Sequence, residues 1–238
     1  MVTQLKLGDI ALDVVQKGIK NVHLSVYPPT GRVRISAPSR MSLDAIRVFA
    51  ISKLGWIKQQ QKKLRDQERE TPREYLDRES HYVWGKRYLL WVVEEHAEPK
   101  VVLKHGKMIL RVNSGTSSDA KQSILARWYR EQIRVAAAEL VAKWEPIVGV
   151  SVNRVFVQKM KTKWGSCNPG SRSLRLNTDL AKKPRECLEY ILVHEMVHLL
   201  ERHHNDRFRE HMYQFMPHWR QYRYELNSMP LAHEKWAY

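Results

Sequence analysis

The segment from residue 184 to about residue 202 limits what this 238-residue chain can fold into more than any other. Its pattern predicts a helix that is apolar on nearly every side, through Leu188, Ile191, Leu192, Val193, Met196, Val197, Leu199 and Leu200. A helix of this kind packs in an interior rather than on a surface. His194, Glu195 and His198 lie within it and need partners, because unpaired buried polar groups are costly.

The spacing of these three residues predicts a metal site. His194 and His198 are four residues apart, so they lie one turn apart on the same helix face. Two imidazoles so arranged can bind one zinc ion, each at about 2.0–2.1 Å. Glu195 is rotated by about 100° from His194, beside the metal, where it can accept a proton from a bound water. This HExxH arrangement is a recognised metalloprotease motif, and the competing interpretation is two hydrogen-bonded core histidines.

A catalytic zinc site also needs a third protein ligand and one open position. The helix is expected to stop near Arg202, and Asn205 to cap the next helix. The turn between them holds His203 and His204, which are adjacent and cannot both face one metal. Spacing alone leaves the choice between these two histidines open.

The bulk composition restricts partners and location. The net charge is +16 and the pI about 9.9, which predicts affinity for polyanions such as nucleic acid or nucleotides, or simply a well-solvated surface. No run of about eighteen apolar residues predicts a membrane span. The start lacks the pattern of a signal peptide. Cys167 and Cys187 are widely separated, so we expect no disulfide framework and a cytoplasmic protein.

Composition along the chain predicts two domains. Strands are expected around the turn signal Pro-Pro-Thr-Gly at 28–31, followed by a helix capped by Ser42. Residues 64–80 are charged and predict a linker, and strands return between 82 and 112. The sequence NSGTSSD at 113–119 predicts the main boundary. Beyond it we expect these elements: a helix over 119–145, strands at 153–160 and 173–180, the 184–202 helix, and helices near 206–215 and 218–227.

Several segments together carry a family resemblance. They are KTKWGSC at 161–167, LRLNTDLAKKPRECLEYILVHEMVHL at 174–199, HHNDRF at 203–208, GRVRISAP at 31–38 and ISKLGWIKQQQKKL at 51–64. With them the chain resembles the YgjP-like family of zinc-dependent hydrolases, a zincin-type domain akin to the WLM and SprT-like peptidases. One departure is Arg209, where the family has an aromatic residue.

The resemblance implies roles for particular residues. His194, His198 and His204 are the implied zinc ligands, and Glu195 is the implied base. The implied fold is α+β: a zincin-like hydrolase domain over residues 116–238, preceded by a β-rich N-terminal domain with one helix over 1–115.

The segment before the metal helix predicts substrate contacts. Trp164, Gly165 and Ser166 lie in extended chain, where zincins pair an edge strand with substrate, although a bend with Trp164 in the core explains them as well. Between residues 154 and 183 there are eight basic residues and one acid, so a cleft lined by this segment is positive. Further polar residues near the motif are candidates for supporting roles or for plain surface positions: Glu201, His211, Tyr213 and His218.

Three hypotheses follow for function. The first is a zinc-dependent metallopeptidase acting on a peptide or protein, with a zinc-activated water and Glu195 as general base. The second is a metal-dependent nucleoside triphosphate pyrophosphohydrolase with the same groups. The third is a nucleic-acid-associated module with structural zinc, which a base beside the metal disfavours, because structural zinc sites are closed by four ligands.

Overall fold

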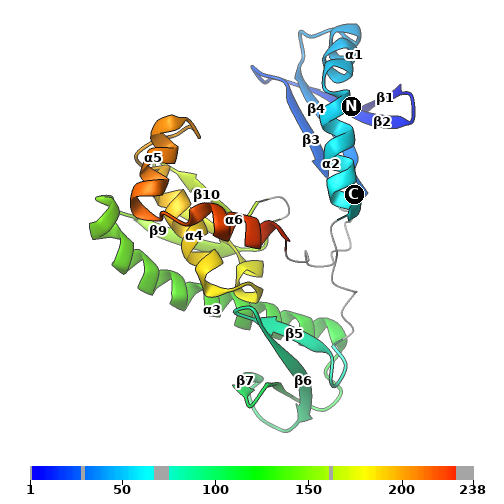
Figure 1. Ribbon diagram of the computed structural model, residues 1–238. Helices are drawn as coiled ribbons and strands as arrows, with labels where there is room; N and C mark the ends of the chain where they lie inside the picture. Colours follow the sequence, from blue (N-terminus) through cyan, green and yellow to red (C-terminus); the bar gives the residue numbers. More distant parts are fainter. Residues whose placement is uncertain (1, 28–29, 67–74, 161–162, 229–238) are drawn as a thin grey trace. The chain divides into compact units, whose positions relative to one another are not determined.

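The computed structural model describes residues 2–27, 30–66, 75–160 and 163–228. It is a mixed α+β protein with six α-helices and eleven strands among these residues (Figure 1). The chain divides into two compact units, the first ending and the second beginning between residues 66 and 75. None of the helices described combines the length and apolar character that crossing a membrane requires.

The first unit is a four-stranded sheet with two helices. The strand order is β1-β2-β4-β3, for β1 Val2–Leu7, β2 Ile10–Lys17, β3 His23–Tyr27 and β4 Arg32–Pro38. β3 and β4 pair antiparallel, as the predicted turn requires, and Gly31 in that turn has a φ of 75°. Alternate residues of β2 and β4, among them Leu12, Val33 and Ile35, are fully buried and form one core with the helices.

The helix predicted after Ser42 is two helices. Ser42 caps α1 (Leu43–Ser52), its side chain accepting a hydrogen bond from the Ala45 N–H at 3.2 Å. The chain leaves helical geometry at Lys53 and continues as α2 (Leu54–Asp66), in which Gly55 is a weak helix former. Part of the linker predicted at 64–80 lies outside the described residues.

The second unit contains two sheets and the remaining helices. One sheet has the order β5-β6-β8-β7, for β5 Ser80–Val83, β6 Lys86–Glu94, β7 Lys100–Lys104 and β8 Lys107–Val112. The other has the order β10-β11-β9, for β9 Arg154–Gln158, β10 Gly165–Asn168 and β11 Ser173–Asn177. The helical elements are α3 Ser118–Val148, the 3₁₀ turn η1 Thr178–Lys182, α4 Arg185–Val197, α5 Asp206–Phe215 and α6 Trp219–Ser228.

The boundary between the units differs from the predicted one between residues 115 and 116. Residues 80–112 share a single core with α3 and α4, to which Leu90, Met108 and Leu110 contribute from the sheet. Leu125 and Ile133 of α3 lie in that same core. Residues 113–117 therefore form a surface turn within the second unit, and α3 begins directly after its N-cap Ser117.

α4 lies in the interior of the second unit, as its apolar pattern predicts. Nine of its residues are buried: Cys187, Leu188, Tyr190, Ile191, Leu192, Val193, Glu195, Met196 and Val197. It contacts α3, α5, α6 and the β10–β11 hairpin, so its end is held from several sides (Figure 1). The helix ends at Val197 rather than near Arg202, and the following residues form turns in which Leu200 N–H bonds to Val197 O at 2.9 Å.

Candidate metal centre

The early end of α4 brings three histidines together. His194 lies in the last turn of the helix, His198 is its C-cap, and His204 lies in the turn before α5. Asn205 caps α5 by accepting a hydrogen bond from the Phe208 N–H at 3.0 Å, which fixes where the returning chain begins its next helix. Each of the three imidazoles offers one nitrogen, and these three atoms lie within 4.8 Å of one another.

Aromatic packing holds the three rings in position. Phe208 of α5 contacts all three imidazoles, with centroid separations of 4.9 Å to His194 and 4.7 Å to His198 and His204. Tyr190 packs edge-on against His194 at 5.9 Å, one turn earlier in α4. The ring nitrogens Nε2 of His194 and His204 face each other at 3.0 Å. Backbone capping and apolar contacts together therefore direct the nitrogens toward one point.

The electrostatics favour the form of histidine that binds metals. Burial, together with the neighbouring His198 and His204, lowers the pKa of His194 to about 3. Burial also lowers the pKa of His198 and of His204. The Nδ1–H of His198 donates to the Glu201 carbonyl oxygen at 3.1 Å, which leaves its Nε2 available to a metal ion. Neutral imidazoles with converging nitrogens fit a divalent transition metal.

Glu195 is a buried carboxylate beside this cluster. It is 6% exposed, and within the described chain no hydrogen bond or ion pair joins its carboxylate to another residue. Burial raises the pKa of Glu195 to about 7, and the Coulombic attraction of Lys163 opposes this only in part. A carboxyl group with this pKa exchanges protons near neutral pH.

β10 passes directly against Glu195 at Gly165. A Cβ at position 165 would lie 2.8 Å from Oε1 of Glu195 and 2.8 Å from Cγ2 of Ile191. Real Cβ atoms do not approach other atoms this closely, so only glycine fits here without a shift of the strand or of α4. Gly165 therefore brings main chain, rather than a side chain, beside the carboxylate.

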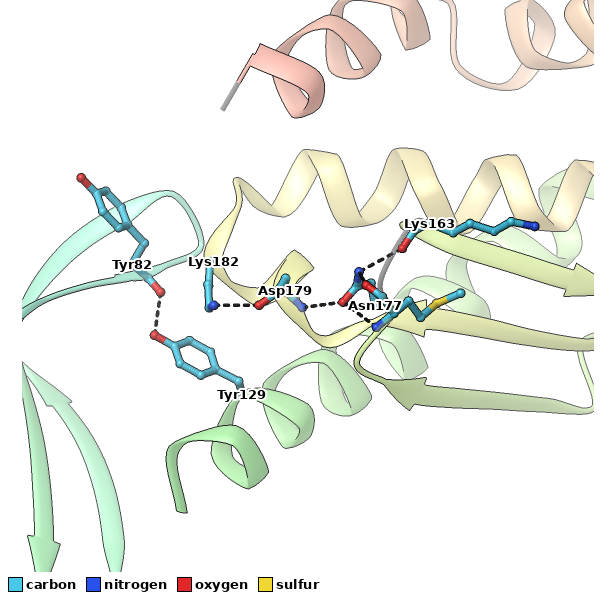
Figure 2. A network of polar contacts seen from close by, with 7 residues as sticks. Tyr82, Tyr129, Lys163, Asn177, Asp179 and Lys182 are labelled. Atoms are coloured by element: carbon cyan, nitrogen blue, oxygen red, sulfur yellow. Dashed lines mark hydrogen bonds and ion pairs between the residues drawn. The ribbon is translucent and has the colours of Figure 1, made fainter. Parts of the chain in front are cut away.

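Asn177 anchors Met160 and Lys163, which precede β10, and the sequence pattern did not identify it. The Asn177 amide group donates to the carbonyl oxygens of Met160 and Lys163, both at 2.9 Å (Figure 2). The Asn177 N–H donates to the Trp164 carbonyl oxygen at 2.9 Å, and Trp164 packs partly buried against the core. A buried asparagine at a strand end is a signal of such a clamp, because its amide can replace missing backbone partners.

Among the described residues, the other candidates from the sequence analysis lie outside the cluster of His194, His198 and His204. His203 is exposed, and its N–H donates to the Glu201 carboxylate at 3.2 Å. Glu201 reaches His198 through its carbonyl oxygen, not through its carboxylate. His211 stacks on Phe215 at 6.0 Å, and Tyr213 packs against Trp219 at 5.8 Å.

The remaining residues are nearby or on the surface. Ser166 lies in β10 opposite Arg175. Burial, together with the nearby Glu195, raises the pKa of the Cys167 thiol to about 11. His218 is exposed after α5, and Arg209 pairs with Asp206 on the surface of α5.

Three histidine nitrogens that converge beside a buried carboxylate could hold one metal ion. A family model described as "YgjP-like, metallopeptidase domain" matches residues 20–229. The chain therefore belongs to the YgjP-like metallopeptidase family, and it is a hydrolase whose domain implies a divalent metal. No curated protein matches the chain.

Two solved structures are similar over part of the chain. One is the metallopeptidase zymogen of Pyrococcus abyssi abylysin, with a TM-score of 0.36 and 18% identity, covering 38% of this chain and 90% of that one. The other is the metallopeptidase zymogen of Methanocaldococcus jannaschii jannalysin, with a TM-score of 0.34 and 21% identity, covering 38% of this chain and 92% of that one. Likeness at these scores carries no weight for the function of this chain.

Proposed function

We propose that the chain is a zinc-dependent metallopeptidase in which His194, His198 and His204 bind the zinc and Glu195 is the general base. The observation that carries the proposal is the three-nitrogen cluster beside a buried carboxylate without a partner among the described residues. Three neutral imidazoles are a ligand set of catalytic zinc sites, which keep a fourth position open. A closed structural site would have no use for an adjacent base.

The chemistry divides between the metal and the chain. When bound, zinc supplies Lewis acidity, which polarises a carbonyl group and lowers the pKa of a water. Glu195 accepts a proton at its carboxylate and then delivers it to the leaving nitrogen of the peptide. A pKa of about 7 suits both transfers, because the group is neither too weak a base nor too weak an acid at neutral pH.

The substrate class follows from the family and from the strand beside Glu195. β10 pairs with β11 and lies at the edge of its sheet as described. An extended peptide can add to such an edge through main-chain hydrogen bonds. We assign Gly165 and Ser166 to this contact, with Trp164 as packing beneath it. The family match favours peptide over phosphoanhydride chemistry, and association with nucleic acid stays a prediction from the net charge.

The finer fold that accompanies this function is a zincin-like domain over residues 116–238. α4 is the helix that carries the HExxH motif, and the turn before α5 supplies the third ligand. The four-stranded sheet β5–β8 packs into the same core and supports this domain from its N-terminal side.

The test is hydrolysis of a casein-like protein by the zinc-loaded chain, with and without chelator. Glu195→Gln should keep one zinc per chain and lower the rate by about 10²–10⁴-fold, because glutamine is nearly isosteric but cannot take the proton. Glu186→Gln is the matched control, since Glu186 is exposed in the first turn of α4. Zinc loss in step with activity in Glu195→Gln would make Glu195 a ligand, and activity that survives chelation would exclude the metal mechanism.

A further inference from the structure

The three-stranded sheet β10-β11-β9 has one face in the core and one open face. Leu174 and Leu176 of β11 are fully buried, and Val155 and Val157 pair opposite them on β9 and pack against the same core. α3 contacts β9, and α4 contacts β10 and β11. Because successive side chains of a strand point to opposite faces, the residues between these four face away from the core.

One row of side chains crosses the open face from strand to strand. Phe156 of β9 pairs with Arg175 of β11, and Arg175 pairs with Ser166 of β10. Arg154 is two residues before Phe156, so it lies on the same face. Phe156 is 38% exposed, and Arg154 is exposed as well. The open face therefore presents an accessible aromatic ring with basic side chains next to it.

Both arginines lie against the Phe156 ring. The Cζ atom of Arg154 is 5.6 Å from the ring centroid, and the Cζ atom of Arg175 is also 5.6 Å from it. Attraction between a cation and the ring face holds a guanidinium group at such a distance. Among the described residues no carboxylate pairs with either guanidinium group. Two positive charges and an exposed ring therefore share one small area.

The chain that builds this face is basic throughout. Between residues 149 and 178 the sequence has no aspartate or glutamate, and its basic residues are Arg154, Lys159, Lys161, Lys163, Arg172 and Arg175. The last acid before this segment, Glu145, accepts a hydrogen bond from the Val152 N–H at 2.6 Å. The first acid after it, Asp179, pairs with Lys182 at 2.7 Å. The segment therefore carries a positive charge that it does not neutralise itself, and this charge attracts polyanions.

The combination of ring and charge selects one kind of polyanion. Single-stranded nucleic acid offers both phosphates and unpaired bases, and every base has a flat face that stacks on an aromatic side chain. An acidic peptide or an anionic lipid surface would use the charge and leave the ring unused. In a duplex the bases are stacked on each other, so a ring on a sheet face does not reach them.

We propose that the open face of the β10-β11-β9 sheet binds single-stranded nucleic acid, with a base stacked on Phe156 and the flanking phosphates on Arg154 and Arg175. The net charge of +16 adds a long-range attraction to the same ligand. The proposal goes beyond the peptidase function and does not depend on it.

The proposed surface and the metal centre lie on opposite faces of β10. Gly165 lies against Glu195 and Ile191, on the side of α4. The next residue, Ser166, points to the open face, because side chains alternate along a strand. A strand bound to the open face therefore leaves Glu195 and the histidines unobstructed, and removal of the metal should not change its affinity.

The experiment is fluorescence anisotropy of a labelled oligothymidylate titrated with the full zinc-loaded chain at several salt concentrations. The probe is about 12 nucleotides long, within the range of known single-strand sites. Phe156→Leu should weaken binding by about tenfold, because stacking of one base is lost, and Phe156→Trp should restore it. Tyr224→Leu is the matched control, because Tyr224 is 77% exposed on α6, and it should leave the affinity unchanged.

The two arginines are tested through the salt dependence. Arg154→Gln and Arg175→Gln should each lower the slope of log affinity against log salt by about 0.7, since one phosphate contact is lost. Phe156→Leu should leave this slope unchanged. Arg127→Gln is the control, because Arg127 is exposed on α3, and it should not change the slope. Equal melting temperatures and zinc contents exclude unfolding as the cause of any loss.

Four results would overturn the proposal. The first is no binding of the probe at low salt, and the second is equal affinity of Phe156→Leu and Tyr224→Leu. The third is equal affinity for a duplex or for a strand of the same length without bases, which would reduce the interaction to charge alone. The fourth is binding that chelator abolishes, which would locate the strand at the metal.

Discussion

The two segments at the ends of α4 each contain a carboxylate with little exposure to solvent, but the two are in opposite electrostatic states. Before the helix, burial by itself would raise the pKa of Asp179, but Lys182 at 2.7 Å, together with Lys159 and Lys183, lowers it. Near the other end, Glu195 has no ion pair among the described residues, and burial raises its pKa to about 7. Burial alone thus does not set the state of a carboxylate, because nearby cations can together outweigh it.

Because their electrostatic states differ, the carboxylates at the two ends of α4 are expected to have different roles. A carboxylate locked to a cation holds η1 in place, whereas a carboxylate without a partner remains available to move protons. Changes near the histidines should therefore cost activity with little loss of stability. Changes at η1 should cost stability and leave the chemistry of each folded molecule intact.

The largest expected effect is on zinc affinity. Loss of a residue that supports a metal ligand lowers metal affinity by roughly 10–100-fold. His204→Ala removes a proposed ligand itself, so it should weaken zinc binding by more than that. His203→Ala should leave zinc content near normal, since His203 lies outside the cluster. Competition with a chromophoric chelator measures both. If His203→Ala loses the zinc and His204→Ala keeps it, the third ligand is misassigned.

Gly165→Ala should lower both the stability of the fold and the activity. The added methyl group would lie 2.8 Å from Glu195 and Ile191, so overpacking should cost about 1–3 kcal/mol and shift the carboxylate. Activity per bound zinc should fall with it. Gly170→Ala is the control, because the nearest atom to its Cβ would be Asn168 Oδ1 at 3.5 Å. Equal effects of the two variants in denaturant unfolding and peptidase assays would contradict the close approach of β10.

Asp179→Asn should lower the free energy of unfolding by about 2 kcal/mol at pH 7, because a charged hydrogen bond in a nearly buried pair is lost. Zinc content and activity per folded molecule should not change. Urea unfolding compares it with Glu131→Gln, which removes an exposed pair with Arg134 and should cost less than about 0.5 kcal/mol. Loss of activity in folded Asp179→Asn protein would contradict the inference that η1 affects stability but not the chemistry.

The smallest expected effect is the pH dependence of the stability difference between the native chain and Asp179→Asn. The folded-state pKa of Asp179 lies below its ordinary value of 3.8, so the ionised group stabilises the fold above about pH 4. Its contribution is lost as the pH falls through the folded-state pKa. The stability gap between the native chain and Asp179→Asn should therefore be constant from pH 5 to 7 and narrow in more acidic solution. A gap that widens toward low pH would show that Lys182 does not stabilise the charged form.

Several of these features could be predicted from sequence because they are local. The four-residue spacing of His194 and His198 places them on one face of any helix, and the apolar residues around them require that helix to be buried. The caps Ser42 and Asn205 could be predicted for the same reason, since a cap acts within its own turn. Membership in the YgjP-like family was also carried by contiguous motifs.

Other features depend on residues far apart in the chain. The two compact units divide between residues 66 and 75. Polar composition such as that at 113–119 marks a surface turn as readily as a domain boundary, and only the shared core of residues 80–112 with α3 distinguishes them. The close approach of Gly165 to Glu195 and the Asn177 clamp each join segments that the sequence leaves unrelated.

The sequence by itself determined that a buried helix carries two histidines and a glutamate in a metal-binding pattern, because helical periodicity needs no tertiary information. Only the tertiary structure decided that His204 rather than His203 faces them, since this depends on where α4 ends and how Phe208 packs. It also decided the states of the two carboxylates. A pKa depends on burial and on the nearest charge, and both are properties of the assembled core.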